Sequence, residues 1–516
     1  MNDKHLQACT SKLEKALAIV ERRAFWAVGF WTIFYFVLAF YLAREKPFWN
    51  DELFTFYISR LPGLSDVWRA LLTGAEQLPP FFFVITRAST AFLGSGHIAF
   101  RLPEMLGFWL MSVSVFQFVR VRLSVTYGLI AMTFPLVTAA FDYAYEARPY
   151  GLVLGFCALA LCCWQASARC GRRALPLLGL ALSAAAAMSC HYYAFLGLSA
   201  ILLGESVRSF NRKKLDLSVW IAFGAGFIPL IFFLPLIEAA RSYSGAFWAK
   251  PKWTNTLGFY NTLLMPTGVT LFMLLIALGV HAMTHSPQVS HRADIRSKIP
   301  AYEIAAVFWL SLIPTAGVVL AEGFTGAFNF RYALPAVIGL SILVSWSASA
   351  IARHRTDIGS FLLVILLALS LANEARSYLV VKGDLNARAS AYQFLSTEAA
   401  GPPLVVVDPH LFFELSHDAA QRKPALNFIY LADVSLALKY TNTDTVDRGL
   451  LALKQWAPLD VQNFDRFCVS HDTFLVYGYP GPFEWVAEDL IAGGWKLIVK
   501  GRNGSELLYL VKRQRD

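Results

Sequence analysis

The residues best suited to chemistry lie in short polar segments between long apolar runs. Three carboxylates in these segments could act as a general base or hold a metal ion: Asp51, Glu52 and Glu146. Five cations could bind a phosphate group: Arg101, Arg148, Arg331, Lys250 and Lys252. Four further side chains could contact a substrate: Tyr150, His191, Tyr192 and Tyr332. Together they suit transfer from a lipid-linked phosphate, because a carboxylate can deprotonate an acceptor hydroxyl while cations stabilise the departing phosphate.

The composition indicates which elements must position these residues. The chain has 516 residues, of which 56% are hydrophobic and 16% are charged, whereas soluble domains carry about 25% charged residues. The apolar residues come in blocks near the length that crosses a bilayer, about 20 residues. These features exclude an ordinary soluble protein, and the 15% of aromatic residues exclude a disordered chain. The sequence predicts a polytopic α-helical membrane protein that contacts the lipid bilayer.

About eleven transmembrane helices are expected, and the charge of the loops orients them. The helices fall near residues 25–42, 98–119, 123–141, 150–168, 174–190, 194–207, 217–239, 263–283, 303–321, 332–350 and 358–374. Basic residues then gather in alternate loops on the side of the N-terminus, which the positive-inside rule makes cytoplasmic. Topology therefore explains the net charge of +10, and no nucleic-acid partner is predicted. An odd number of spans places the C-terminal region outside the cytoplasm.

Three regions follow from this topology. Residues 1–23 form a cytoplasmic or interfacial segment, residues 24–374 form the transmembrane domain, and residues 375–516 form an extracytoplasmic α/β domain. The first outer loop is long, at about 44–97. The strands and helices expected in the last region are 404–407, 473–477, 495–499, 507–511, 385–399 and 484–493. Two of these strands flank GRNG at 501–504, which indicates a hairpin. The DPH sequence at 408–410 could be catalytic, but it is interpreted as a turn at a strand end.

In this topology every candidate residue named above lies at the outer membrane surface. The orientation is derived from Lys and Arg residues of other loops. The location of all candidate residues on one side is therefore partly independent evidence for a common site. It predicts one polar site at the outer interface. No spacing of Cys and His is typical of a metal centre, so no metal ligand is assigned.

The motifs around these residues resemble the GT-C fold glycosyltransferases. The resemblance covers about residues 25–350, and its segments are FWNDE at 48–52, QLPPFFF at 77–83, FRLP at 100–103, YEARPYGL at 145–152, HYYA at 191–194 and RYALP at 331–335. The most similar group is the dolichyl-phosphate-mannose–protein mannosyltransferase-like one, with its bacterial aminoarabinose and galacturonic acid transferase relatives. Each motif alone is weakly specific, but their order and common face make the set more specific.

The resemblance implies an inverting transferase that takes a sugar from a polyprenyl-phosphate donor, of the undecaprenyl-phosphate type in bacteria. Asp51 would be the general base with Glu52 as its neighbour, and Glu146 would position a substrate or contact a metal. Arg331, Arg148 and Arg101 would bind the donor phosphate. Some relatives bind a divalent cation, but no firm ligand set is visible here. The acceptor would be a hydroxyl of a lipid, polysaccharide or protein outside the cytoplasm, at a bacterial inner membrane.

Structural interpretations of the same residues remain open. Asp51 and Glu52 could cap a juxtamembrane helix, because acidic residues favour a helix N-terminus. Glu146 and Arg148 could be solvated loop charges, and His191 could be a structural histidine beside two tyrosines. Lys250 and Lys252 could contact lipid headgroups, and an arginine at a span start, such as Arg331, could extend to the interface. Asp142 and Glu322 also lie near the outer face without an assigned role.

Two other classes of function compete with a transferase. A secondary transporter or lipid flippase would place ionisable residues near the bilayer midplane and often contains repeats, but the expected spans are nearly free of charge at that depth and no repeat is visible. A noncatalytic membrane scaffold would display the C-terminal domain and would tolerate changes in the outer-loop carboxylates.

Overall fold

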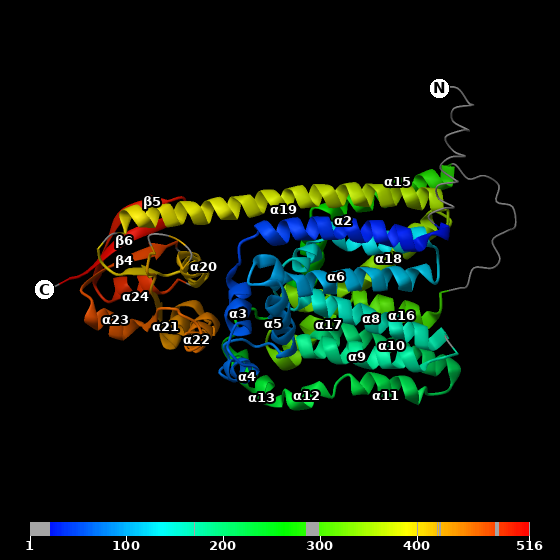
Figure 1. The fold of residues 1–516 in the computed structure, drawn as a ribbon, viewed down its shortest axis with the longest axis horizontal. Helices are drawn as coiled ribbons and strands as arrows, with labels where there is room; N and C mark the ends of the chain where they lie inside the picture. Colours follow the sequence, from blue (N-terminus) through cyan, green and yellow to red (C-terminus); the bar gives the residue numbers. More distant parts are fainter. Residues whose placement is uncertain are drawn as a thin grey trace, which may run out of the picture.

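The computed structural model describes residues 21–169, 171–284, 299–399, 401–420, 422, 425–479 and 484–514. Most of the segment expected at 1–23 lies outside these residues, and so does part of one basic loop, with Arg292, Arg296 and Lys298. The described chain forms a helical bundle with a smaller α/β domain at one end (Figure 1).

Apolar helices build the bundle, and three pairs of them are bent at a short break. The unbroken helices are α2 (Ala24–Glu45), α6 (His97–Arg120), α7 (Val125–Thr133), α8 (Tyr150–Arg169), α9 (Ala174–Cys190), α10 (Ala194–Arg212) and α18 (Ala336–Ile351). The bent pairs combine α11 (Leu217–Ala225) and α12 (Pro229–Phe232) with α13 (Leu234–Arg241), α14 (Thr254–Leu264) with α15 (Thr267–Thr284), and α16 (Ala301–Ser311) with α17 (Ile313–Leu320). A proline stands at each break: Pro235, Pro266 and Pro314. Proline interrupts a helix because it has no backbone N–H to donate.

Four helices among the described residues are long and apolar enough to cross a membrane: α2, α6, α8 and α19 (Thr356–Glu398). The number rises to seven if each bent pair is one span, and four shorter apolar segments accompany them. The prediction of a polytopic helical membrane protein is confirmed, whereas the number of eleven spans stays a prediction.

Helices α6 and α8 approach closely because glycines face each other between them. A Cβ on Gly107 would lie 2.5 Å from the Gly151 backbone, and one on Gly155 would lie 2.3 Å from the Gly107 carbonyl oxygen. Glu104, fully buried in α6, accepts a hydrogen bond from the Leu152 N–H at 2.9 Å. These contacts fix the start of α8, and with it the YEARPY segment, against α6.

The long loop between α2 and α6 folds into three short helices, α3 (Asn50–Ser59), α4 (Leu64–Leu72) and α5 (Phe81–Leu93). They cover the end of the bundle next to the C-terminal domain (Figure 1). Shorter 3₁₀ and π turns complete the bundle: η1 (Phe134–Val137), η2 (Ala139–Ala144), η3 (Ser244–Ala246), η4 (Ala321–Thr325) and η5 (Phe330–Ala333).

The C-terminal domain contains a four-stranded and a two-stranded sheet. The strands are β1 (Leu404–Val406), β2 (Tyr430–Ala432), β3 (Val461–Asn463), β4 (Thr473–Gly478), β5 (Trp495–Asn503) and β6 (Glu506–Arg513). The larger sheet has the order β1-β4-β6-β5, with β1 parallel to β4 and the other pairs antiparallel. Strands β2 and β3 pair in parallel, and a bridge from Val405 to Ile429 joins the two sheets. The four expected strands are confirmed, including the hairpin.

The helices of this domain differ more from the expectation. They are α20 (Pro409–Ala419), α21 (Val434–Thr441), α22 (Thr445–Leu453), α23 (Phe464–Ser470) and α24 (Val486–Ala492), of which only the last was expected. The DPH sequence follows β1 closely, as predicted, but Pro409 and His410 begin α20 and do not form a separate turn. The Asp408 side chain caps α20 by accepting the Leu411 N–H at 2.7 Å. The helices expected at 358–374 and 385–399 form one continuous helix, α19, of 43 residues. It runs along the bundle and into the C-terminal domain (Figure 1).

Candidate active site

The turn before α3 orients both acidic residues of the FWNDE segment. Trp49 is the N-cap, and Asp51 and Glu52 occupy the first helical turn, where carboxylates face the positive end of the helix dipole. Glu52 also accepts the Trp49 N–H at 3.4 Å, as in a capping box. Successive helical residues point about 100° apart. Glu52 therefore points into the bundle, where it is fully buried, while Asp51 faces a cavity.

Arg101 holds this turn from the inside. Its Nε and Nη2 bind the two carboxylate oxygens of Glu52 at 2.7 and 2.6 Å, and its other donors reach the carbonyl oxygens of Ala43, Lys46 and Pro47 at 2.6–3.0 Å. Both side chains of the pair are completely buried. Protein oxygens occupy all of these donors. Arg101 therefore has the position of a structural residue and not of the phosphate-binding residue that the sequence predicted.

Asp51 forms an ion pair with Arg331, which opens the RYALP segment. The Arg331 guanidinium also lies 4.8 Å from the centre of the Trp49 ring. Burial would raise the pKa of the Asp51 carboxyl, but the charges of Arg331 and Arg148 outweigh burial and hold the pKa below its usual value. Asp51 is therefore a carboxylate at neutral pH, with a cation at its side.

Arg148 is the second cation at this position, and it is paired with a residue that the sequence reasoning did not select. Its Nη1 binds Glu76 Oε2 at 2.6 Å and the Asp51 carbonyl oxygen at 3.1 Å. Its Nε is buried and has no hydrogen-bond partner among the described residues. An unsatisfied donor of this kind can bind an anionic oxygen.

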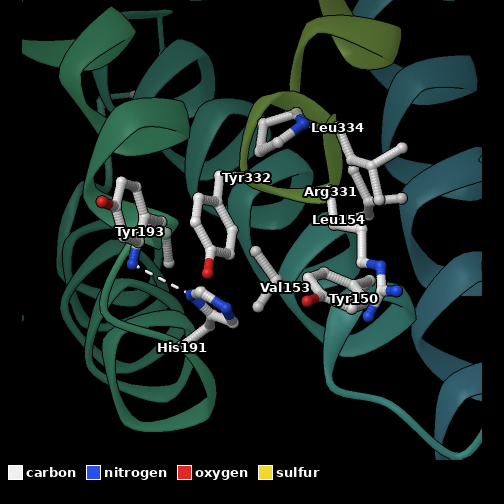
Figure 2. A pocket seen from close by; sticks show the side chains of 10 residues that line it. Tyr150, Val153, Leu154, His191, Tyr193, Arg331, Tyr332 and Leu334 are labelled. Carbon is white, nitrogen blue, oxygen red and sulfur yellow. Dashed lines mark hydrogen bonds between the residues drawn. The ribbon is translucent and has the colours of Figure 1, made fainter. Parts of the chain in front are cut away.

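Aromatic rings line the site beside Arg331 (Figure 2). Tyr193 and Tyr332 stack at 4.1 Å between ring centres, and the His191 ring lies 5.3 Å from Tyr332 and 5.5 Å from Tyr150. The Tyr193 N–H donates to His191 Nδ1 at 3.0 Å, so Nδ1 is an acceptor and the imidazole proton lies on Nε2. Burial, with the charges of Arg148 and Arg331, lowers the pKa of His191 to about 3. His191 is therefore neutral.

Glu146 lies behind this group and not in it. Its Oε1 forms an ion pair with Lys46, and both side chains are largely buried. Burial raises the pKa of the Glu146 carboxyl, and Lys46 only partly offsets this effect. Its Oε2 is buried and has no hydrogen-bond partner within the described part of the chain. Glu146 thus contacts the segment before α3 and does not line the cavity that Asp51 faces.

One cavity of about 610 Å³ unites the site. Seven of the residues selected from the sequence line it: Asp51, Arg148, Tyr150, His191, Tyr192, Arg331 and Tyr332. The five that do not line it are Glu52, Arg101, Glu146, Lys250 and Lys252. The two lysines are exposed on the segment before α14. The C-terminal domain supplies part of the wall, with His410 from α20 and Thr445, Val446 and Gly449 from α22.

The same arrangement of helices and C-terminal domain occurs in solved structures of ArnT from Cupriavidus metallidurans. The apo structure is similar with a TM-score of 0.58 and 12% identity, over 94% of this chain and 98% of that one. The structure bound to undecaprenyl phosphate gives a TM-score of 0.56 and 13% identity over the same shares. The chain has the GT-C fold. No family model matches the sequence, and no curated protein matches it significantly.

Both acidic and basic side chains line the cavity. Within the described ranges, no group of three or more His, Cys, Asp or Glu side chains is arranged to hold a metal ion. The two carboxylates that line the cavity, Asp51 and Glu76, are each paired with an arginine. These residues do not form a ligand set for a divalent cation.

Several cavity residues of this GT-C fold were missed from the sequence. Glu76 directly precedes the QLPPFFF segment and could have been found from its place in the first outer loop. Tyr193 belongs to the HYYA segment but was not selected. His410 belongs to the DPH sequence, which was interpreted as a turn, but it lies in the first turn of α20, and the packing of α20 against the bundle brings it to the cavity.

Proposed function

We propose that the protein is a membrane glycosyltransferase that moves a sugar from a polyprenyl-phosphate donor to an acceptor hydroxyl. One observation carries the proposal: a carboxylate, Asp51, lies with two arginines, Arg331 and Arg148, in one large cavity of a GT-C fold. The similar ArnT structure bound to undecaprenyl phosphate supports a lipid-phosphate donor. The acceptor is a hydroxyl of a lipid, polysaccharide or protein.

The chemistry is a single displacement at the sugar. The acceptor oxygen attacks the anomeric carbon, the bond from that carbon to the phosphate oxygen breaks, and the configuration inverts. Asp51 accepts the acceptor proton as general base. Arg331 and Arg148 stabilise the negative charge that grows on the departing phosphate, and the unsatisfied Nε of Arg148 supplies a donor for it.

The ion pair between Asp51 and Arg331 links donor binding to activation of the base. A carboxylate with a depressed pKa is a weak base, because proton transfer is most effective when the pKa lies near the working pH. When the donor phosphate takes hydrogen bonds from Arg331, the attraction between Arg331 and Asp51 weakens. The pKa of Asp51 then rises towards a more useful value, so that the base is activated when the donor is in place.

The other residues of the cavity orient the substrates. The stacked rings of Tyr193 and Tyr332, with Tyr150, offer flat faces that suit a sugar ring. The neutral His191 and the Tyr192 hydroxyl, which is buried without a hydrogen-bond partner among the described residues, can bind sugar hydroxyls. The charge of the loops supports a cytoplasmic N-terminus and a site on the outer face. The similarity to ArnT from Cupriavidus metallidurans supports a bacterial inner membrane.

The test is a transfer assay with purified protein. The protein is incubated with a panel of polyprenyl-phosphate sugars and membrane extract as acceptor, and products are identified by mass spectrometry. We expect one donor to lose its sugar in wild type but not in Asp51→Asn. If no donor is consumed and the protein instead moves a lipid or solute across proteoliposomes, the transferase proposal is wrong and a transporter is favoured.

A further inference from the structure

The C-terminal domain packs directly on the helix that carries Asp51. Helix α20 lies against α3, and aromatic side chains interleave between them. The Phe413 ring lies 5.1 Å from Phe54 and 5.7 Å from Tyr57, measured between ring centres, and His417 lies 4.7 Å from Phe56. This contact joins the C-terminal domain to the catalytic part of the chain.

A polar clamp continues this contact at the N-terminus of α3. Arg388, on the extended part of α19, donates from Nη1 to the Phe48 carbonyl oxygen at 2.7 Å. Its Nη2 pairs with Glu414 of α20 at 2.8 Å, and the two side chains are only 10% and 18% exposed. A largely buried ion pair that also binds the backbone restricts motion more than an exposed pair does.

Glu414 completes the clamp on the other side of Trp49. Its carboxylate accepts a hydrogen bond from the backbone N–H of Asn50, the first residue of α3. The first N–H groups of a helix have no partner within it, and a carboxylate satisfies one here. Arg388 and Glu414 thus hold the carbonyl before Trp49 and the amide after it, and Asp51 is the next residue.

We propose that Arg388 and Glu414 are positioning residues for Asp51. The C-terminal domain thereby contributes to the geometry of the active site. This inference rests on the proposed function, because it assigns the clamp to the base of that reaction. Arg101 and Glu52 hold the same turn from the bundle side. The turn is therefore fixed from two sides, and each side comes from a different part of the chain.

The position of Asp51 explains why the contact from Arg388 and Glu414 should affect the reaction. Asp51 reaches Arg331 only from the first turn of α3, which begins one residue earlier. A displacement of about 1 Å can cost on the order of 100-fold in rate. Loss of the clamp displaces Asp51 but removes no group that binds the donor phosphate, because Arg331 and Arg148 belong to other segments. It therefore lowers kcat and does not weaken donor binding.

The experiment uses the full-length protein and compares Arg388→Met, Glu414→Ala and Glu414→Gln with Asp472→Asn. Asp472 forms an exposed ion pair with Arg513 in the same domain and serves as the matched control. We expect Arg388→Met and Glu414→Ala to lower kcat by about 10- to 100-fold, with a Kd for undecaprenyl phosphate no more than about threefold above that of wild type. Glu414→Gln keeps an acceptor for the Asn50 N–H and should recover part of the rate.

Hydrogen–deuterium exchange of peptides from residues 48–59 gives a readout that does not need activity. Exchange should rise in Glu414→Ala and stay at the wild-type level in Asp472→Asn. An unchanged kcat, or equal losses of kcat and donor binding, overturns the positioning role. If wild type transfers no sugar but exchange rises as expected, the clamp stands and the proposed function fails.

Discussion

The Asp51 carboxylate forms an ion pair with the Arg331 guanidinium, although the two residues stand 280 positions apart in the sequence. Asp51 lies in the first turn of α3, and Arg331 lies in η5, just before α18. The pair combines the proposed base with the cation proposed to bind the donor phosphate. A phosphate that binds here competes with Asp51 for the same guanidinium, and this competition leads to the first two predictions.

Asp51→Asn should lower kcat by about 100- to 10,000-fold, which is the usual contribution of a general base. The amide keeps the size of the side chain but cannot accept the acceptor proton. Transfer is measured with the identified donor, and thermal unfolding in detergent verifies the fold. Asp384→Asn, at an exposed position of α19, is the control and should behave as wild type. Near-normal transfer by Asp51→Asn would remove this residue as the base.

Arg331→Met should shift the acidic limb of the pH–rate profile to higher pH. Arg331 is the main cause that lowers the pKa of Asp51 against burial, so its removal lets that pKa rise. A higher pKa keeps Asp51 protonated, and therefore inactive, up to a higher pH. The profile of kcat/KM is measured, because it reports the free enzyme, in which Arg331 is paired with Asp51. The variant should also bind undecaprenyl phosphate more weakly. Arg376→Met, exposed on α19, should leave the limb in place, and an equal limb in both variants would contradict the link.

Arg101→Met should destabilise the fold by about 3–5 kcal/mol, because it leaves the buried Glu52 carboxylate without its partner. The expected result is a lower thermal unfolding temperature and a lower yield, while the protein that remains folded keeps its affinity for undecaprenyl phosphate. Asp472→Asn removes an exposed pair and should cost at most about 1 kcal/mol. Weaker donor binding at unchanged stability would return Arg101 to the phosphate-binding role expected from its sequence.

Gly449→Leu should block the cavity from the side of the C-terminal domain. Gly449 lines the cavity, and a Cβ there would meet the Phe54 ring at 3.8 Å, an ordinary contact. Gly449→Ala should therefore fold well, with a helix more stable by about 0.5–1 kcal/mol, and keep most of its activity. The larger leucine side chain fills space that a substrate needs, and transfer should fall at least tenfold more than in the alanine variant. Equal activity of the two would exclude this wall from the substrate site.

Much of the architecture followed from the sequence, because the properties that determine it are local. Apolar runs long enough for a bilayer predicted the membrane bundle, and alternation with turn residues predicted four strands of the C-terminal domain. The outer-loop motifs brought Asp51, Arg148, Tyr150, His191 and Arg331 into one predicted site, and the cavity contains all five. Each of these signals lies within a few residues of the feature that it predicts.

Only the tertiary structure determines which side chains form ion pairs with each other and which line the cavity. Arg101 and Arg331 have similar surroundings in the sequence, each at the start of an apolar run. Packing buries Arg101 against Glu52 and leaves Arg331 at the cavity. The clamp of Arg388 and Glu414 on α3 joins residues more than 300 positions from Phe48. An ion pair or a wall residue such as His410 depends on which helices meet, and that depends on packing across the whole chain, which no local pattern encodes.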